Sequence, residues 1–461
     1  MATTEFTRTQ TAGTSTKKFT VSMWVKRGGD LGGYPTLFSC GTGSSDGFNL
    51  AFTNNDFLIL EAYDGSANPK LETTRTFRDV GAWYHIVAVF DTDAAATDRM
   101  RFYVNGVEET SFTQDTNPSA SYVIPGWSGS GDTMRIGYTT LSGSWTYFDG
   151  VMAHVHVCDG QAYAASDFGE FDSTSGIWVP NNSPSVTYGI NGGFYKFVSG
   201  ALTTDSSGES NTLTSVGTPT TTKDTPQNNF CTWNPNSKDP SETYTFSNGN
   251  TVCLIPSASG WSGTSGTLAA AGGKWYIEGY INYTPGAKNT TCGFTSTKLV
   301  GQNGCEGQLG FGDKGSLATG YGVSVGVYDT GELLYSTDAA KEQNTGSWAT
   351  AWAAGDYLMF AIDIDGGKFY FGANGTWDAG ASNDPAAGTG GYTFVPGGEL
   401  YTPITTIYQE RLEMNFGNGY FSTTAIGSPN ADANGEGAFK YAPPTGFYAM
   451  CTNNLKLYGG A

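Results

Sequence analysis

The sequence has few basic residues, few histidines and no long hydrophobic run. Lys and Arg number 23 against 42 Asp and Glu, which gives a formal net charge of −19 at pH 7. Nucleic-acid binding depends on Lys and Arg neutralising phosphates, so this balance excludes nucleic acid as a partner. No apolar stretch approaches the ~20 residues that cross a bilayer, so membrane insertion is not expected either.

The first residues also lack the features of a secretion signal. From Met1 to Arg8 there is neither a basic start nor an apolar run. We therefore expect the chain to be made and folded in a cytoplasm.

Cysteine is scarce, and its number is odd. An odd set cannot pair completely within one chain, and the spacing fits neither a disulfide scaffold nor a Cys-x-x-Cys metal site. We expect most of the cysteines to be free, buried thiols, with a single bridge between Cys292 and Cys305 as the alternative. The seven residues are Cys40, Cys158, Cys231, Cys253, Cys292, Cys305 and Cys451.

The three histidines leave little material for a Ser-His-Asp or Cys-His apparatus. Two of them, His154 and His156, alternate with Cys158 along one predicted strand and are residue types that bind zinc. Residues on one face of a strand are spaced about 6.6 Å apart, too far to converge on one ion without a bulge. We expect a packed, hydrogen-bonded face here.

Glycine and aromatic residues are abundant instead. The 65 glycines, 14% aromatic residues and only 14% charged residues favour short strands joined by tight turns, as in all-β sandwiches. Single cores rarely grow beyond roughly 250–300 residues, so a chain of 461 residues predicts two domains. Helix should be scarce.

Two hairpins far apart in the chain, residues 81–106 and 355–375, follow one plan. Each begins with an aromatic-led apolar strand long enough to be covered on both faces and returns as an alternating strand. Each then ends in Asn-Gly, at residues 105–106 and 374–375, a pair that tolerates positive φ in a tight turn. The repetition predicts two β-sandwiches in tandem.

Apolar periodicity disappears between the two halves, where Thr, Ser, Gly, Asp and Pro dominate. We therefore assign residues 1–198 to the first sandwich, 199–230 to a linker or an ordered crossing without core residues, and 231–461 to the second sandwich. The chain contains no heptad stretch or short repeat, so it has no stalk of its own.

Several short segments carry a resemblance to known families. The first domain contains WYHIV at 83–87, RFYVNG at 101–106, MRIG at 134–137 and FDG at 148–150. In this order they resemble the concanavalin A-like jelly rolls of the laminin-G-like type. The second domain, with its segments 273–278, 355–363, 401–403 and 414–417, looks like a SPRY domain. These resemblances imply two tandem concanavalin A-like sandwiches.

Further motifs extend the pattern between and beyond these segments: DGQ at 159–161, DFG at 167–169, GIWVP at 176–180, DTP at 224–226, NNF at 228–230 and PPTGF at 443–447. Their combination resembles a recurring architecture of tailed-phage virion proteins. The resemblance implies a structural component on the virion surface, a tail fibre or related appendage, whose partners are other virion proteins. A homo-oligomer, with a trimer favoured, is implied as well, but neither a ligand nor a catalytic residue.

Jelly rolls of this superfamily include glucanases, which need Glu-x-Asp-x-Glu or Glu-x-Asp-x-x-Glu on one strand. The nearest approach is Glu170-Phe171-Asp172, which has no third carboxylate. We therefore expect no enzymatic activity.

Acidic residues offer one cofactor, Ca²⁺. Asp91, Asp93 and Asp98 crowd one predicted turn and supply oxygen ligands for a hard cation. The alternative is that Asp favours turns by bonding its own backbone.

Aromatic residues set among Gly and Ser are the features most suggestive of recognition. A sugar ring stacks its apolar face on an aromatic plane, while nearby Asp or Asn side chains bind its hydroxyls. For each Trp the alternative is a plug over the end of a sandwich or a subunit contact. The candidates are Trp127, Trp145, Tyr147 and Trp377, with Asp149 and Asp378.

These observations favour a non-enzymatic virion protein that contacts polysaccharide of the host cell surface. The first rival is a purely structural protein that decorates a capsid or cements a tail. A secreted bacterial lectin conflicts with the missing signal and the odd cysteine count, and a glycan-degrading enzyme conflicts with the missing carboxylate triad.

Overall fold

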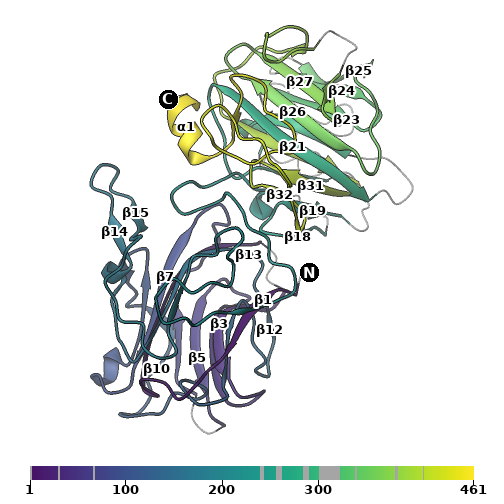
Figure 1. The fold of residues 1–461 in the computed structure, drawn as a ribbon. Helices are drawn as coiled ribbons and strands as arrows, with labels where there is room; N and C mark the ends of the chain where they lie inside the picture. The colour runs from purple at the N-terminus through teal and green to yellow at the C-terminus, as the bar shows by residue number, and fades with distance from the viewer. Residues whose placement is uncertain are drawn as a thin grey trace. The chain divides into compact units, whose positions relative to one another are not determined.

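The chain forms two compact units of strands, drawn in Figure 1 as a ribbon of the computed structural model. The first unit is Met1–Thr221 and the second is Thr222–Ala461. Strands dominate both units, which confirms the prediction of an all-β chain. The structure describes residues 3–29, 32–65, 68–238, 243–255, 262–283, 290–300, 322–337, 340–378, 383–408 and 410–460.

Two sheets enclose the core of the first unit. In spatial order, the larger sheet consists of β10 (Phe112–Thr116), β6 (Lys70–Thr73), β5 (Leu58–Tyr63), β4 (Gly47–Phe52), β3 (Tyr34–Gly41), β11 (Thr133–Ile136), β1 (Glu5–Thr9) and β17 (Thr214–Val216), with β12 (Trp145–Tyr147) beside β3. The other sheet consists of β16 (Gly193–Tyr195), β13 (Gly150–Asp159), β2 (Lys18–Arg27), β7 (Tyr84–Asp91), β8 (Met100–Val104) and β9 (Val107–Glu108). A separate hairpin pairs β14 (Gly169–Phe171) with β15 (Trp178–Pro180).

Strand β2 shows how this core forms. Its alternate residues Phe19, Val21 and Met23 are fully buried between the two sheets, as the period of two requires. The residues between them are buried as well, because a further apolar cluster, which includes Val87 of β7 and Phe168, lies on the outer face of the same sheet. The prediction of strands covered on both faces is confirmed.

The second unit repeats this plan. One sheet consists of β18 (Thr245–Ser247), β19 (Val252–Leu254), β31 (Arg411–Asn415), β21 (Lys274–Tyr283), β26 (Tyr357–Asp363), β27 (Lys368–Ala373) and β28 (Thr376–Trp377), with β29 (Tyr392–Thr393) on β27 and β34 (Tyr448–Ala449) on β21. The other consists of β20 (Ser262–Ser265), β30 (Tyr401–Ile407), β22 (Thr290–Ser296), β23 (Ser324–Tyr328), β24 (Glu332–Thr337) and β25 (Ala340–Ser347). A short hairpin pairs β32 (Tyr420–Phe421) with β33 (Thr424–Ala425).

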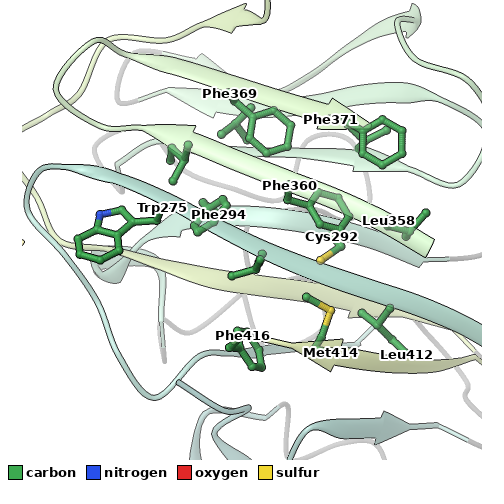
Figure 2. Packing of buried hydrophobic residues seen from close by; sticks show 14 of the residues in the cluster. Trp275, Cys292, Phe294, Leu358, Phe360, Phe369, Phe371, Leu412, Met414 and Phe416 are labelled. Atoms are coloured by element: carbon green, nitrogen blue, oxygen red, sulfur yellow. The ribbon is translucent and has the colours of Figure 1, made fainter. Parts of the chain in front are cut away.

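Side chains from both sheets fill the second core. Figure 2 shows Phe360 and Phe371 of the duplicated hairpin packed near Phe294 and Cys292 of the opposite sheet, with Met414 alongside. All five are buried with no measurable exposure. Together with the first unit, this arrangement confirms two tandem sandwiches of jelly-roll type.

Helix is confined to short elements in the described residues. The α-helix α1 spans Thr452–Tyr458, and 3₁₀ turns lie at Ala96–Asp98, Ala165–Asp167, Pro235–Ser237 and Thr297–Leu299. In the part of the chain that the structure describes, no helix has the length and apolar character needed to span a bilayer.

The duplicated hairpins, β7–β8 and β26–β27, close with the same turn. Asn105 and Gly106 have φ of 48° and 84°, and Asn374 and Gly375 have φ of 51° and 84°. In each turn the Asn side-chain oxygen accepts a backbone N–H near the start of the hairpin, at 2.8 Å for His85 and 3.0 Å for Tyr357. Positive φ at both positions matches the twist of the flanking strands, which is why Asn-Gly is used.

An aromatic ring from a later segment covers the glycine of each turn. A Cβ added to Gly106 would lie 2.6 Å from the ring of Trp178, and one added to Gly375 would lie 2.8 Å from the ring of Tyr441. Only glycine permits these contacts. The two units therefore share the turn and also the way in which the turn anchors the chain that covers the sheet.

The segment 199–230 is divided between the two units. In the first unit, β17 pairs with β1 and Leu213 lies in the core, so this part is not free of core residues. In the second unit, Phe230 forms a bridge with Cys451 and is fully buried. The segment is thus an extension of both sandwiches.

Six cysteines lie in the described residues, and all six are buried, as expected. Cys305, the proposed partner of Cys292, lies outside the described residues.

Candidate functional site

Trp127 does not lie on the surface, which makes its assignment as a glycan contact wrong. Its side chain is 1% exposed and its ring packs at 4.9 Å from that of Phe19. The indole N–H donates to the backbone oxygen of Lys18 at 3.3 Å. Gly126, at φ of 69°, lies so close to Gly41 that an added Cβ would be 2.5 Å from the Cα of Gly41. The plug alternative describes this residue.

Trp145 and Tyr147 remain half-buried at the surface, where β12 runs parallel to the start of β3. This pairing places Trp145 beside Tyr34, with ring centroids 5.3 Å apart. Tyr147 stacks on Tyr138 at 3.9 Å with an angle of 7° between the ring planes. We call these four residues the aromatic face.

The sequence did not single out Tyr34 or Tyr138 as site residues. Both are half-buried tyrosines at strand ends, next to Pro35 and Gly137 respectively. The sequence signal that could have found them is the neighbouring Pro35 and Gly137, which are residue types that interrupt strands.

A polar row continues from the aromatic face across the outside of the larger sheet. Strand register aligns Arg135 of β11, Ser39 of β3, Asn49 of β4 and Glu61 of β5, while their neighbours along each strand point into the core. Arg135 forms an ion pair with Glu5 at 2.8 Å. Ser39 and Asn49 are 1% and 2% exposed, so the members of this row that reach the surface are the half-buried Arg135 and Glu61.

Tyr147 lies within electrostatic reach of this row. Burial, together with the charge of Glu5, raises the pKa of Tyr147 above its usual value. Its hydroxyl therefore stays protonated at neutral pH and is able both to donate and to accept a hydrogen bond. The aromatic face thus combines flat apolar rings with polar groups at their edge.

The other predicted glycan residues are placed differently. Asp149 is half-buried in the turn after β12, where its backbone oxygen accepts the N–H of Gly28 at 2.7 Å. Trp377 and Asp378 lie in the second unit. The ring of Trp377 packs edge-on against Tyr276 at 6.1 Å, and the carboxylate of Asp378 accepts the N–H of Thr350. These contacts hold a turn in place.

The predicted calcium residues are engaged by lysines and by their own turn. Asp91 pairs with Lys18 at 2.9 Å, and its carboxylate also accepts the N–H of Asp93 at 3.2 Å. Asp98 accepts the hydroxyl of the adjacent Thr97 at 3.1 Å. In the described ranges no group of three His, Cys, Asp or Glu side chains is placed to hold a metal. This arrangement matches the alternative, in which Asp stabilises the turn.

One Ser-His contact lies in the first unit, with Nε2 of His85 at 2.8 Å from Oγ of Ser22. Nδ1 of His85 accepts the indole N–H of Trp178 at 2.9 Å. An indole can only donate, so the neutral imidazole carries its proton on Nε2 and donates to the serine. A general base would have to accept the serine proton at Nε2, so this tautomer does not activate Ser22. Burial lowers the pKa of His85 to about 3, which keeps this neutral form.

The strand that carries His154 and His156 does contain a bulge. Pairing of β13 with β2 shifts register between Ala153 and His156, and His154 adopts a φ of 48°. His156 stacks on Phe194 at 3.9 Å and its Nδ1 lies 3.0 Å from the hydroxyl of Tyr188. This is the packed face that the sequence led us to expect.

Glu170 and Asp172 belong to the β14–β15 hairpin. Glu170 is exposed on β14, whereas Asp172 follows the strand and accepts the N–H groups of Thr174 and Ser175 at 3.1 and 2.7 Å. Asp172 therefore shapes the hairpin turn.

Comparison with known proteins found one family model that matches part of the first unit. Residues 2–165 match the family model Laminin_G_3, described as the concanavalin A-like lectin/glucanases superfamily. No curated protein matches the chain.

Solved structures with similarity include the SPRY domain of human HERC1, at 15% identity and a TM-score of 0.27 over 40% of this chain and 96% of that one. A heptameric SAP-like pentraxin from Limulus polyphemus is similar at 17% identity and a TM-score of 0.28, over 40% and 87% of the two chains. The CBM40 of a Ruminococcus gnavus IT-sialidase, bound to alpha2,6 sialyllactose, is similar at 18% identity and a TM-score of 0.25, over 32% and 80%. The family match makes the first unit similar to laminin-G-like, concanavalin A-like domains, and the sheets make the chain a tandem of two sandwiches.

Proposed function

We propose that this protein is a non-enzymatic structural protein of a phage virion that contacts host-surface polysaccharide through the aromatic face. The observation that carries the glycan contact is the set of four half-buried rings, Tyr34, Tyr138, Trp145 and Tyr147, next to a polar row. Aromatic planes of this kind suit the apolar face of a sugar, and the polar groups at their edge suit its hydroxyls.

Display on a virion is supported by the motif combination described above and by the weakness of a single site. A stacked ring contributes about 1 kcal/mol beyond the area it buries, so useful avidity requires many copies on one particle. A symmetric homo-oligomer, with a trimer favoured, supplies such copies and other virion proteins hold it on the particle surface. Light scattering of the purified protein should give three times the monomer mass, and a monomer alone would contradict self-assembly.

Two observations support the absence of catalysis. The neutral His85 carries its proton on Nε2, the nitrogen that faces Ser22, and Asp172 is bound to the backbone of its own turn. Incubation of the protein with host envelope polysaccharide should release no reducing ends. Release that disappears in a Glu170→Gln variant would favour the enzyme instead.

The glycan contact is tested by Trp145→Ala and Tyr147→Ala in the full chain, with binding to whole host cells and melting temperature both measured. Cell binding should fall at least tenfold with little change in melting, because both rings lie at the surface. Phe171→Ala serves as the control, since Phe171 is 58% exposed on the β14–β15 hairpin, away from the aromatic face. Absence of cell binding by the unchanged protein would favour the purely structural rival.

A further inference from the structure

A stack of three rings occurs at equivalent places in the two units. In the first unit it consists of Trp24 on β2, His85 on β7 and Trp178 on β15, and ring centroids of successive members lie 4.9 and 5.9 Å apart. The equivalence is set by the duplicated turn, because His85 bonds Asn105 and Trp178 covers Gly106.

The second unit has tyrosines at all three positions. Tyr280 of β21 faces Tyr357 of β26 across the strand pair at 4.6 Å, and Tyr441 lies 6.4 Å from Tyr357. Tyr357 bonds Asn374 and Tyr441 covers Gly375, as in the first unit. Equivalent positions in the two units thus bring three rings together, with stacked rings in the first unit and with the Tyr441 ring edge-on to Tyr357, at 78°, in the second.

The two stacks differ in exposure. In the first unit Trp24 is 3% exposed and His85 is fully buried beneath the covering segment. In the second unit Tyr280, Tyr357 and Tyr441 each stay half-buried at the surface. The open stack is therefore partly exposed to solvent, with Phe421 packed against the rings of Tyr280 and Tyr357.

A lysine ammonium group lies over the open stack. Nζ of Lys440 is 4.2 Å from the centre of the Tyr357 ring and 5.7 Å from that of Tyr441. Among the described residues Lys440 forms no ion pair with a carboxylate. The chain has 42 acidic and 23 basic residues. A lysine that lies above aromatic rings, and not beside a carboxylate, is available for an anionic ligand.

Hydrogen bonds to a buried carboxylate fix the backbone at this lysine. The N–H groups of Lys440 and Tyr441 donate to the carboxylate of Glu278 at 2.9 and 2.8 Å, and Glu278 is fully buried. Asn415 and Tyr276 donate to the same carboxylate at 3.1 and 3.0 Å. The backbone that carries the Lys440 and Tyr441 side chains is therefore held in place before a ligand arrives, which lowers the entropic cost of binding.

We propose that Lys440, Tyr280, Tyr357 and Tyr441 form a second saccharide site, on the second unit, for a sugar that carries a carboxylate. The ammonium group pairs with the carboxylate, and the tyrosine rings and hydroxyls contact the sugar beside it. The net charge of −19 repels densely charged polyanions, so the matching ligand carries widely spaced carboxylates. This site is separate from the aromatic face of the first unit.

The test uses methyl glucuronide and methyl glucoside as probes, because they differ only in a carboxylate. Saturation-transfer NMR on the full chain should detect the glucuronide with at least tenfold tighter binding than the glucoside, and binding should weaken with added salt. Lys440→Gln should weaken glucuronide binding about tenfold, whereas Lys440→Arg should retain it. The melting temperature of each variant shows whether the fold is kept.

Lys456→Gln is the matched control, since Lys456 is an exposed lysine of the same unit, on α1. Equal binding of the two probes, or glucuronide binding that is unchanged in Lys440→Gln, would overturn the proposal. Trp145→Ala is read out by binding to whole host cells and Lys440→Gln by the preference for glucuronide over glucoside, so failure of this site and failure of the aromatic face give different results.

Discussion

Among single residues, the buried carboxylate of Glu278 connects the C-terminal segment of the second unit to strand β21. Four donors converge on it, two from the backbone of the covering segment and two from side chains of the sheet. A buried acceptor of this kind is costly to leave unpaired, at about 1–3 kcal/mol for each lost partner. Glu278 therefore holds residues 440 and 441, near the C-terminus, against a strand that lies much earlier in the sequence.

Glu278 also predicts how the stability of the second unit varies with pH. Burial raises its pKa to about 7, while its hydrogen bonds oppose the shift. Because the folded-state pKa is above the unfolded value of 4.5, protonation of Glu278 stabilises the folded state. This stabilisation is complete below pH 4.5 and is lost as pH rises toward 7. The loss is on the order of 3 kcal/mol. Hydrogen exchange of residues 430–450 should thus quicken between pH 5 and 8 beyond its intrinsic rise, and Glu278→Gln should remove that excess. The same excess in both proteins would contradict this role.

At the scale of the element, the Asn-Gly turn is a device used twice. Each turn needs positive φ at two positions, and each glycine faces an aromatic ring that fixes the covering chain. The turn therefore shapes the hairpin and also selects where the outer layer is attached.

Alanine substitutions separate these two functions. Gly375 and Gly446 have the same φ of 84°, but a Cβ at Gly375 meets the Tyr441 ring, whereas a Cβ at Gly446 meets nothing within 4 Å. Gly446→Ala should cost about 1 kcal/mol of backbone strain. Gly375→Ala should cost more, by about another 1–3 kcal/mol, because the ring must move. Urea unfolding of both variants measures the difference, and equal losses would show that the ring contact is unimportant.

The outer layer of the first unit should be sensitive to acid. Burial lowers the pKa of His85 to about 3, and it lowers the pKa of His154 and His156 too, with Lys196 adding repulsion. A lowered pKa in the folded state gives stability that is complete above pH 6.5 and is lost as pH falls toward 3. Hydrogen exchange in the β14–β15 hairpin should therefore show increased opening at pH 4.5 relative to pH 7.5. His154→Gln should reduce this change, and an unchanged hairpin at both pH values would contradict it.

For the whole molecule, each sandwich has its own core, and the boundary between the units falls at residues 221 and 222. The chain crosses that boundary once in the segment that the sequence marks by its loss of apolar periodicity. Separate cores imply that each unit resists proteolysis after the connection is cut.

Limited trypsin digestion should cut first after Lys223, which is exposed next to the boundary. Two resistant fragments of similar size should remain, and mass spectrometry identifies their ends. Early cutting at Arg99 or Arg101, inside the first duplicated hairpin, would show that the division into units is wrong.

Periodicity was enough to predict the sandwiches, since Phe19, Val21 and Met23 alternate along β2 and must share one face. The turn at Asn374-Gly375 was equally readable, because its φ values suit few other residues. These features are local, so the neighbouring residues alone specify them.

The candidate sites depend on contacts between distant parts of the chain. Trp127 and Trp145 both stand next to Gly and Ser, yet one fills the core and the other lies at the surface, because the course of each loop is set by strands elsewhere. Tyr138 meets Tyr147 where β12 pairs with β3, and Lys440 meets Tyr357 where Glu278 binds the backbone of residues 440 and 441. Burial and ring contact are properties of the packed molecule, and local residue patterns do not encode them.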